Sequence, residues 1–244
     1  MHVKVLDDRV VERAKARGLD ALVYAPHFTR LPDVEAAAER YTDEDLLVVP
    51  GRELFTGDWR DRKHVLAVGL SEPVPDFCTL SGTMAELRRQ EAAVLVPHPE
   101  FATVSFDADD VRAYADVVDA VEVYNPKHLP YHNDRAREIA RETGKPGFAS
   151  SYAHLRGTVG EAWTTFETSF ETGADLVAAL RAGAPRRQFH RDGTAHALRC
   201  GAEVAHLFYE NSWQKFDRLF LSGTEPTHPR HVAYQGRFDD VAVY

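Results

Sequence analysis

Histidines and one glutamate recur where short apolar segments of this chain begin or end, and these residue types bind metal ions. One such residue lies in or beside each of the segments HVKVL, ALVYAP, LLVVPGREL, HVLAVGL, AAVLVPH and FASSYAH. The residues are His2, His27, Glu53, His64, His98 and His154. Imidazole and carboxylate groups suit zinc, manganese or iron, and a carboxylate can bridge two ions about 3.5–4 Å apart, as two-metal hydrolases require. A histidine-lined polar pocket without a metal is the alternative.

Strands and helices alternate along the chain up to His154, and this arrangement would gather those side chains. The hydrophobic pattern predicts helices between most of a series of strands, at 2–6, 21–25, 46–54, 64–70, 92–98, 119–125 and 146–151. Such alternation predicts a mostly parallel sheet, and short strands that are apolar on both faces fit a closed or nearly closed barrel. The carboxyl ends of barrel strands face the active site, so side chains at those ends are expected to meet.

The chain after His154 is expected to be largely helical. It should contain a helix, a loop and one long or two shorter amphipathic helices, at 174–183, 184–189 and 196–220, before a turn-rich tail that ends in a strand-like VAVY. We expect a barrel domain over 1–183 and a C-terminal extension over 184–244 that packs on it as one structural unit. Four histidines of the extension have no supporting carboxylate at helical spacing and are expected to be surface or capping residues: His196, His206, His228 and His231.

Composition and charge narrow the class of protein. The 244 residues are 44% apolar, which is normal for a globular α/β core. The 38 acidic and 29 basic residues give a net charge of −9, which opposes sequence-independent binding of nucleic acid. Cys78 and Cys200 form no CxxC pair, and the chain shows no dinucleotide or P-loop motif, no leader and no apolar run of membrane length. We therefore expect a soluble, cytoplasmic protein.

Five short motifs resemble those of the PHP (polymerase and histidinol phosphatase) domain family of metal-dependent phosphoesterases. Members of that family usually have HxH in the first strand, TDH after the second, GxE and then a histidine, HP after a later strand, and SDAH near the end. The corresponding places here hold HVK (2–4), APH (25–27), GRE (51–53) with His64, HP (98–99) and SYAH (151–154). The resemblance runs over residues 2–183. It implies an α/β fold, a distorted (β/α)7 barrel with a helical C-terminal extension.

Three positions depart from the family pattern. Lys4 stands in place of the second histidine of HxH, Pro26 in place of the aspartate of TDH, and Tyr152 in place of the aspartate of SDAH. Of the three ion subsites that the resemblance implies, the one that would use His2 and Glu53 loses two partners, to Lys4 and Tyr152. We expect that subsite to be empty, with the Lys4 ammonium where a cation would lie.

The other two subsites keep more of their ligands. Glu53, His64 and His98 would give one ion three protein ligands and an open fourth position for water. His27 and His154 would hold another ion weakly, because its ligand from the loop after the first strand is missing. The resemblance therefore implies one or two divalent ions, zinc or manganese, with iron as a further candidate.

The resemblance implies a hydrolase of phosphoesters that uses metal-activated water on a small phosphorylated metabolite or nucleotide. Glu53, His98 and Arg156 are the candidate catalytic residues, and Arg156 would neutralise phosphate charge two residues past His154. The lost acids suggest an alternative, a catalytically weakened relative that serves as a ligand-binding or regulatory protein. An RNA-processing subunit is a third reading, which the acidic charge and the absence of an aromatic-basic stripe oppose.

Overall fold

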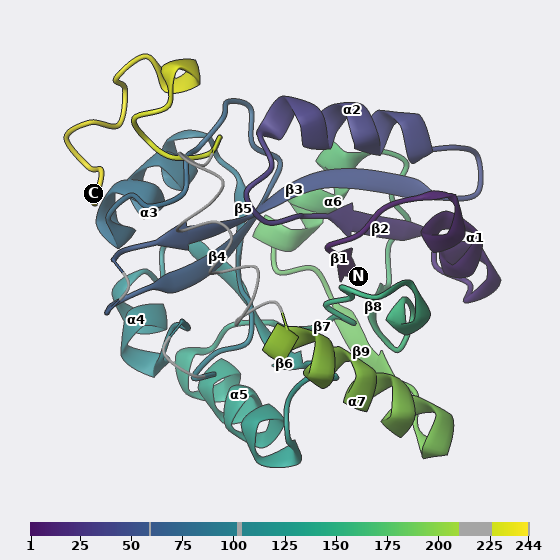
Figure 1. Ribbon diagram of the computed structural model, residues 1–244. Coiled ribbons are helices and arrows are strands. Elements are labelled where there is room, and N and C mark those ends of the chain that lie inside the picture. Colours follow the sequence, from purple (N-terminus) through teal and green to yellow (C-terminus); the bar gives the residue numbers. More distant parts are fainter. Residues whose placement is uncertain (59, 102–103, 210–225, 244) are drawn as a thin grey trace.

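The computed structural model describes residues 1–58, 60–101, 104–209 and 226–243, and its main feature is a curled seven-stranded sheet (Figure 1). The strands lie side by side in sequence order: β1 (His2–Val3), β2 (Ala21–Tyr24), β3 (Leu47–Thr56), β4 (Lys63–Val68), β5 (Ala93–Val96), β6 (Val118–Tyr124) and β7 (Gly147–Ala149). Neighbouring strands are parallel, except that β4 is antiparallel to both β3 and β5. A parallel bridge between Val3 and Ala153 brings the segment after β7 back to β1. The predicted α/β barrel class is confirmed, in the form of a curled half-barrel.

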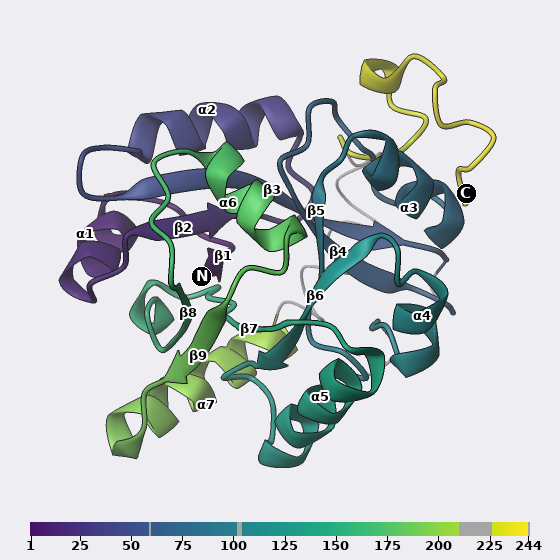
Figure 2. The same ribbon diagram turned by 180° about the vertical axis from the view of Figure 1, so that it is seen from behind.

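Helices connect most of the strands and surround the sheet, as two opposite views show (Figures 1 and 2). They are α1 (Asp8–Ala16), α2 (Leu31–Tyr41), α3 (Leu80–Arg89), α4 (Ala108–Ala113), α5 (Pro130–Thr143), α6 (Gly173–Arg181) and α7 (Gly193–Tyr209). Local sequence fixes several of their starts: the Asp7 carboxylate accepts a hydrogen bond from the Val10 N–H at 3.1 Å, and Thr172 and Asp175 form a capping box at α6. Among the described residues no helix is both long and apolar enough to cross a lipid bilayer.

The strands carry apolar residues on both faces because both faces are packed. In β5, Val94 and Val96 belong to a buried cluster that includes Val111 of α4. Leu95 points the other way and belongs to a second cluster, which includes Leu176 of α6. Burial on two sides explains why β5 reads as an uninterrupted hydrophobic run rather than an alternating one.

A separate two-stranded antiparallel sheet is formed by β8 (Ala162–Phe166) and β9 (Arg186–His190). The predicted loop over 184–189 is therefore wrong for most of its length. The sequence of β9 is RRQFH, which lacks the apolar alternation by which a strand is recognised. Its pairing with β8 makes it a strand, and the rings of Trp163 and Phe189 stack across the pair with their centres 5.7 Å apart.

The end of the chain also differs from the prediction. Residues 241–243 form no strand, and an isolated antiparallel bridge joins Ala242 to Cys78. The helix predicted over 196–220 is present as part of α7 up to Tyr209, and its remainder lies outside the described residues.

A buried ion pair attaches β3 to the loop that precedes α3. Arg52 and Asp76 are both fully buried, and Nη2 of Arg52 donates to Oδ2 of Asp76 at 2.9 Å. The other oxygen of Asp76 accepts a hydrogen bond from the backbone N–H of Phe55 at 2.8 Å. Because alternate side chains of a strand point to opposite faces, Arg52 points away from its neighbour Glu53. The pair therefore anchors the strand that carries Glu53 without entering the site.

We expect Asp76→Asn to lower the free energy of unfolding by about 3–5 kcal/mol, because it leaves the Arg52 charge buried without a counter-charge. Urea denaturation followed by circular dichroism measures this loss. Asp109→Asn is the matched control: it breaks the exposed Arg112–Asp109 pair, whose atoms are 2.7 Å apart, and should cost less than about 1 kcal/mol. Equal losses in the two variants would show that the buried pair contributes no more than a surface pair.

Candidate metal centre

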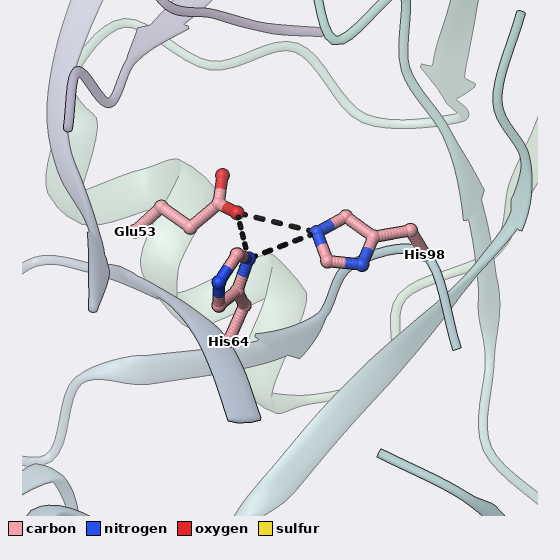
Figure 3. A group of neighbouring side chains, drawn as sticks. All are labelled: Glu53, His64 and His98. Atoms are coloured by element: carbon pink, nitrogen blue, oxygen red, sulfur yellow. Dashed lines mark hydrogen bonds and ion pairs between the residues drawn. The ribbon is translucent and has the colours of Figure 1, made fainter. Parts of the chain in front are cut away.

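Glu53, His64 and His98 come from consecutive parts of the sheet and meet at one end of it (Figure 3). Glu53 lies in the second half of β3, and His98 lies two residues after the end of β5. His64 lies near the start of β4, opposite Phe55 of β3. Because β4 runs antiparallel to both neighbours, its start lies at the same edge as the ends of β3 and β5. The start of β4 and the ends of β3 and β5 therefore bring their side chains together.

The three side chains are buried and point toward a common position. Oε1 of Glu53 lies 3.1 Å from Nδ1 of His64 and 3.3 Å from Nε2 of His98, and the two nitrogens are 3.4 Å apart. In a tetrahedral site with metal–ligand distances of about 2.0–2.1 Å, the ligand atoms are separated by roughly 3.3–3.4 Å. The observed separations fit a single ion with three protein ligands.

Hydrogen bonds fix which nitrogen of His98 carries its proton. The Ser105 hydroxyl donates its one hydrogen to the carbonyl oxygen of Phe101 at 2.8 Å, so it accepts from Nδ1–H of His98 at 2.9 Å. Nε2 of His98 therefore holds a lone pair and faces the carboxylate of Glu53. A cation between Nε2 of His98 and Oε1 of Glu53 would be attracted by both atoms and would remove their mutual repulsion. The hydrogen bond to Ser105 is of the kind that commonly supports a metal-binding histidine.

Lys4 and Tyr152 both contact the Glu53 carboxylate. The Tyr152 hydroxyl donates to Oε1 at 2.9 Å, and the Lys4 ammonium forms an ion pair with Oε2. Lys4 also donates to the carbonyl oxygen of Ala25. The two residues that depart from the family pattern thus form part of the hydrogen-bond network of Glu53, and Lys4 supplies a positive charge beside it.

The pKa shifts in this cluster favour metal-binding protonation states. Burial would raise the pKa of Glu53, but the Lys4 ammonium, and after it the nearby imidazoles of His27 and His64, hold this pKa well below its ordinary value. Burial lowers the pKa of His27 to about 3 and that of His64 to about 4. At neutral pH Glu53 is therefore ionised and His27 and His64 are neutral, and these are the forms that coordinate divalent ions.

His2 and His27 lie at the other oxygen of Glu53. Nε2 of His27 is 3.7 Å and Nε2 of His2 is 4.0 Å from Oε2 of Glu53. Neither nitrogen of His2, nor Nε2 of His27, has a hydrogen-bond partner within the described part of the chain. The rings of His27 and His154 are 5.5 Å apart between centres. Since Lys4 occupies the same oxygen, a second cation at Oε2 would have to compete with its ammonium.

His154 lies beside two charged residues that sequence reasoning missed. The Lys127 ammonium contacts Nδ1 of His154 and lies 3.3 Å from Oε2 of Glu203. Oε1 of Glu203 accepts hydrogen bonds from the backbone N–H groups of His154 and Leu155, at 3.0 and 2.9 Å. Lys127 and Glu203 are both buried, and Glu203 comes from α7. The C-terminal extension over 184–244 therefore supplies a carboxylate beside His154.

The sequence contained a signal for one of these two residues. Lys127 follows β6 at the same edge of the sheet where His27 and His98 follow β2 and β5, so the same reasoning from strand ends could have selected it. Glu203 has no such signal. It lies inside the helical run GAEVAHLF, and only the position of α7 against the sheet shows where its side chain points.

Glu122 positions the backbone of His98. Its Oε2 accepts hydrogen bonds from the His98 N–H at 2.8 Å and from the side-chain amide of Asn125 at 3.0 Å. Burial raises the pKa of Glu122 to about 7. His98 has a φ of 36°, in the left-handed region that residues other than glycine rarely adopt. The Glu122 contact holds this strained residue so that its ring faces Glu53.

Arg156 is not brought to the cluster. Its side chain is more than half exposed and forms an ion pair with Asp7, the cap of α1. No contact within the described ranges joins it to Glu53, His64 or His98. The catalytic role predicted for Arg156 therefore has no support from its position.

The fold and the cluster together define an α/β half-barrel with a candidate divalent metal centre at one end. Residues 130–185 match a family model described as PHP-associated. This match covers part of the chain, and it agrees with the resemblance to the PHP domain family that the five sequence motifs carry. No curated protein sequence matches the chain.

Two solved structures share the fold. PsfC from Pseudomonas syringae PB-5123 has a TM-score of 0.62 and 20% identity, with 87% of this chain and 96% of that chain covered. A proposed metal-dependent phosphoesterase from Bifidobacterium adolescentis ATCC 15703 has a TM-score of 0.51 and 14% identity, with 75% and 94% covered. At these identities the likeness establishes the fold alone.

We expect the purified protein to retain about one zinc or manganese ion per chain, as a site with three protein ligands predicts. The double variant His64→Ala/His98→Ala should lose it, because one ligand cannot hold a divalent ion against dialysis. Elemental analysis after dialysis without chelator measures the content. His190→Ala/His231→Ala, which removes an exposed and a partly exposed histidine outside the cluster, should keep the ion. Equal metal content in both double variants would exclude the site.

Lys4→Met should raise the affinity for this ion about tenfold, or about 1.4 kcal/mol, because it removes a positive charge from the carboxylate that binds the cation. Competition with a chromophoric chelator measures the change. Lys15→Met, which removes a lysine paired with Asp43 on the surface, should leave the affinity unchanged. A lower affinity in Lys4→Met would mean that the ammonium serves mainly to orient Glu53.

Proposed function

We propose that this protein is a PHP-like hydrolase of phosphoesters that works with one divalent ion held by Glu53, His64 and His98. The observation that carries the proposal is the convergence of these three side chains at separations of 3.1–3.4 Å. A bound divalent ion would supply a Lewis acid and a water acidic enough to act as nucleophile near neutral pH. The match of residues 130–185 to a PHP-associated family model and the likeness to a proposed metal-dependent phosphoesterase support the phosphoester class.

Lys4 and Lys127 give the site the positive charge that a phosphate ester requires. Their ammonium nitrogens lie 5.2 and 4.1 Å from the centre of the Tyr152 ring. Both lysines are buried, so their attraction for an anionic transition state is stronger than that of a solvated surface lysine. We assign to these two ammonium groups the neutralising role that the sequence suggested for Arg156.

The substrate would approach past His27, which has the most exposed side chain among the histidines of the cluster, at 21%. Beside it the rings of Phe28, Phe55 and Phe77 form a stack, with centre-to-centre distances of 4.7 and 5.8 Å. The His27 ring meets Phe55 edge-on at 5.0 Å. An aromatic wall next to buried cations suits a small phosphate monoester with an apolar or planar organic part, such as a phosphorylated metabolite or a nucleotide.

One observation favours a second candidate function, a ligand-binding or regulatory protein derived from such an enzyme. The ion pair between Lys4 and Glu53 neutralises the carboxylate without any metal. A site of this kind could still bind a phosphorylated ligand through its lysines while turning over little or none of it.

We expect manganese-stimulated release of phosphate from a panel of small phosphate monoesters. The rate should fall at least about 100-fold in His64→Ala/His98→Ala, because removal of two ligands abolishes metal-supported transition-state stabilisation. Phosphate release is measured colorimetrically, with His190→Ala/His231→Ala as the control that keeps the rate. Absence of turnover together with tight binding of a phosphate monoester would favour the ligand-binding function.

A further inference from the structure

A second buried carboxylate, Glu161, lies among basic side chains that the metal centre does not use. Its Oε1 is 3.5 Å from Nη2 of Arg13, 3.3 Å from Nη2 of Arg17 and 3.0 Å from Nη1 of Arg199. Its Oε2 is 2.8 Å from Nδ1 of His196. Three guanidinium groups from different parts of the chain therefore converge on one carboxylate oxygen.

The positive charge at this place exceeds what Glu161 can neutralise. A fourth arginine, Arg191, adjoins the group and donates to the carbonyl oxygen of Gly160 at 3.1 Å. Within the described residues, Glu161 is the only carboxylate that forms an ion pair with any of the four arginines. Four guanidinium groups around one carboxylate leave a local surplus of positive charge, on a protein whose net charge is −9.

The arginines affect one another and can be reached from solvent. Burial, and then the neighbouring guanidinium groups, lower the pKa of Arg13 and of Arg17, against the opposite effect of Glu161. The side chains of Arg13, Arg17 and Arg199 keep 25, 17 and 34% of their surface exposed. The cluster is therefore an open basic surface over a buried acid, not a closed internal ion pair.

The fold builds this surface from separate elements. Arg13 and Arg17 lie on or just after α1, Arg191 follows β9, and Arg199 lies in α7. Gly160 has a φ of 78°, and a Cβ there would lie 2.8 Å from Cγ of Arg17. Glycine is therefore needed both for the backbone conformation and for the close approach of Arg17.

We propose that the arginine cluster, formed by Arg13, Arg17, Arg191 and Arg199, is a binding site for a phosphate group, separate from the metal centre. Guanidinium groups match phosphate oxygens with paired hydrogen bonds, and their charge stays fixed at any physiological pH. Glu161 lies beneath the arginines, where it competes with an anion for their charge, and leaves their outer edges exposed. The acidic net charge opposes a long polyanion, so the ligand class is inorganic phosphate or a small phosphate monoester.

Phosphate bound here would also fix α7. Arg199 and Glu203 are four residues apart on that helix, so they lie one above the other along the same face. Arg199 belongs to the arginine cluster, whereas Glu203 bonds the backbone at His154 in the metal centre. An anion that ties Arg199 to the arginines of the α1 region should therefore stabilise the placement of Glu203.

Isothermal titration of the full chain with inorganic phosphate, in EDTA and at constant ionic strength, tests the proposal. Arg17→Gln/Arg199→Gln should weaken binding at least about tenfold, because it removes two of the charged hydrogen-bond donors for the anion. Lys4→Met/Lys127→Met should bind phosphate as the unchanged protein does, which separates this site from the two lysines of the proposed active site. The control Arg88→Gln/Arg112→Gln removes the same charge from two exposed arginines and should have no comparable effect.

Glu161→Gln provides a second measurement, because it removes the competing internal anion and should tighten phosphate binding about tenfold. Equal weakening in the two arginine double variants would overturn the proposal, as would loss of binding in Lys4→Met/Lys127→Met alone. If Arg17→Gln/Arg199→Gln fails to fold, unchanged or weaker binding by folded Glu161→Gln would overturn it instead.

Discussion

The burial of the Glu53 carboxylate is the physical constraint on which the site depends. Removing an ionised carboxylate from water costs several kcal/mol unless other groups compensate for the lost solvation. Compensation here comes from the Lys4 ammonium, the Tyr152 hydroxyl and the imidazole of His64. Lys4 follows β1, His64 lies in β4 and Tyr152 follows β7, so the folded sheet is required for Glu53 to remain charged. The same requirement explains why the site residues are so distant in sequence.

Two features of the sheet bring those partners within reach. The antiparallel direction of β4 places His64 at the edge where the parallel strands end. At the other side, the Lys4 N–H donates to the carbonyl oxygen of Ala153 at 2.9 Å, which fixes the segment that contains Tyr152 beside β1. Tyr152 has a φ of 45°, and its backbone N–H donates to Ser150 Oγ at 3.1 Å. Backbone strain at Tyr152, as at His98, is maintained because the surrounding hydrogen bonds over-determine the conformation.

Most strands of the barrel could be predicted from the sequence because a strand that is buried on both faces reads as an apolar run. β9 could not, since RRQFH owes its conformation to pairing with β8. The convergence of Glu53, His64 and His98 was predicted from their places at strand ends and from the family motifs. The approach of Glu203 to His154 was not predicted, because the position of α7 against the sheet depends on tertiary packing. Arg156 lies near His154 in sequence, yet its side chain pairs with Asp7 at the surface, which shows that closeness in sequence does not decide side-chain direction.

The two buried lysines lie in similar environments. Lys4 contacts the carboxylate of Glu53, and Lys127 lies between His154 and the carboxylate of Glu203. In each case an ammonium group meets a buried carboxylate beside an imidazole that could otherwise serve a metal ion. A lysine supplies one positive charge at a fixed place without requiring a ligand set, but it cannot polarise water as a divalent ion does. Among the described residues, a set of three side chains placed to share one metal ion is therefore found only at Glu53, His64 and His98, and the two lysines supply positive charge beside it.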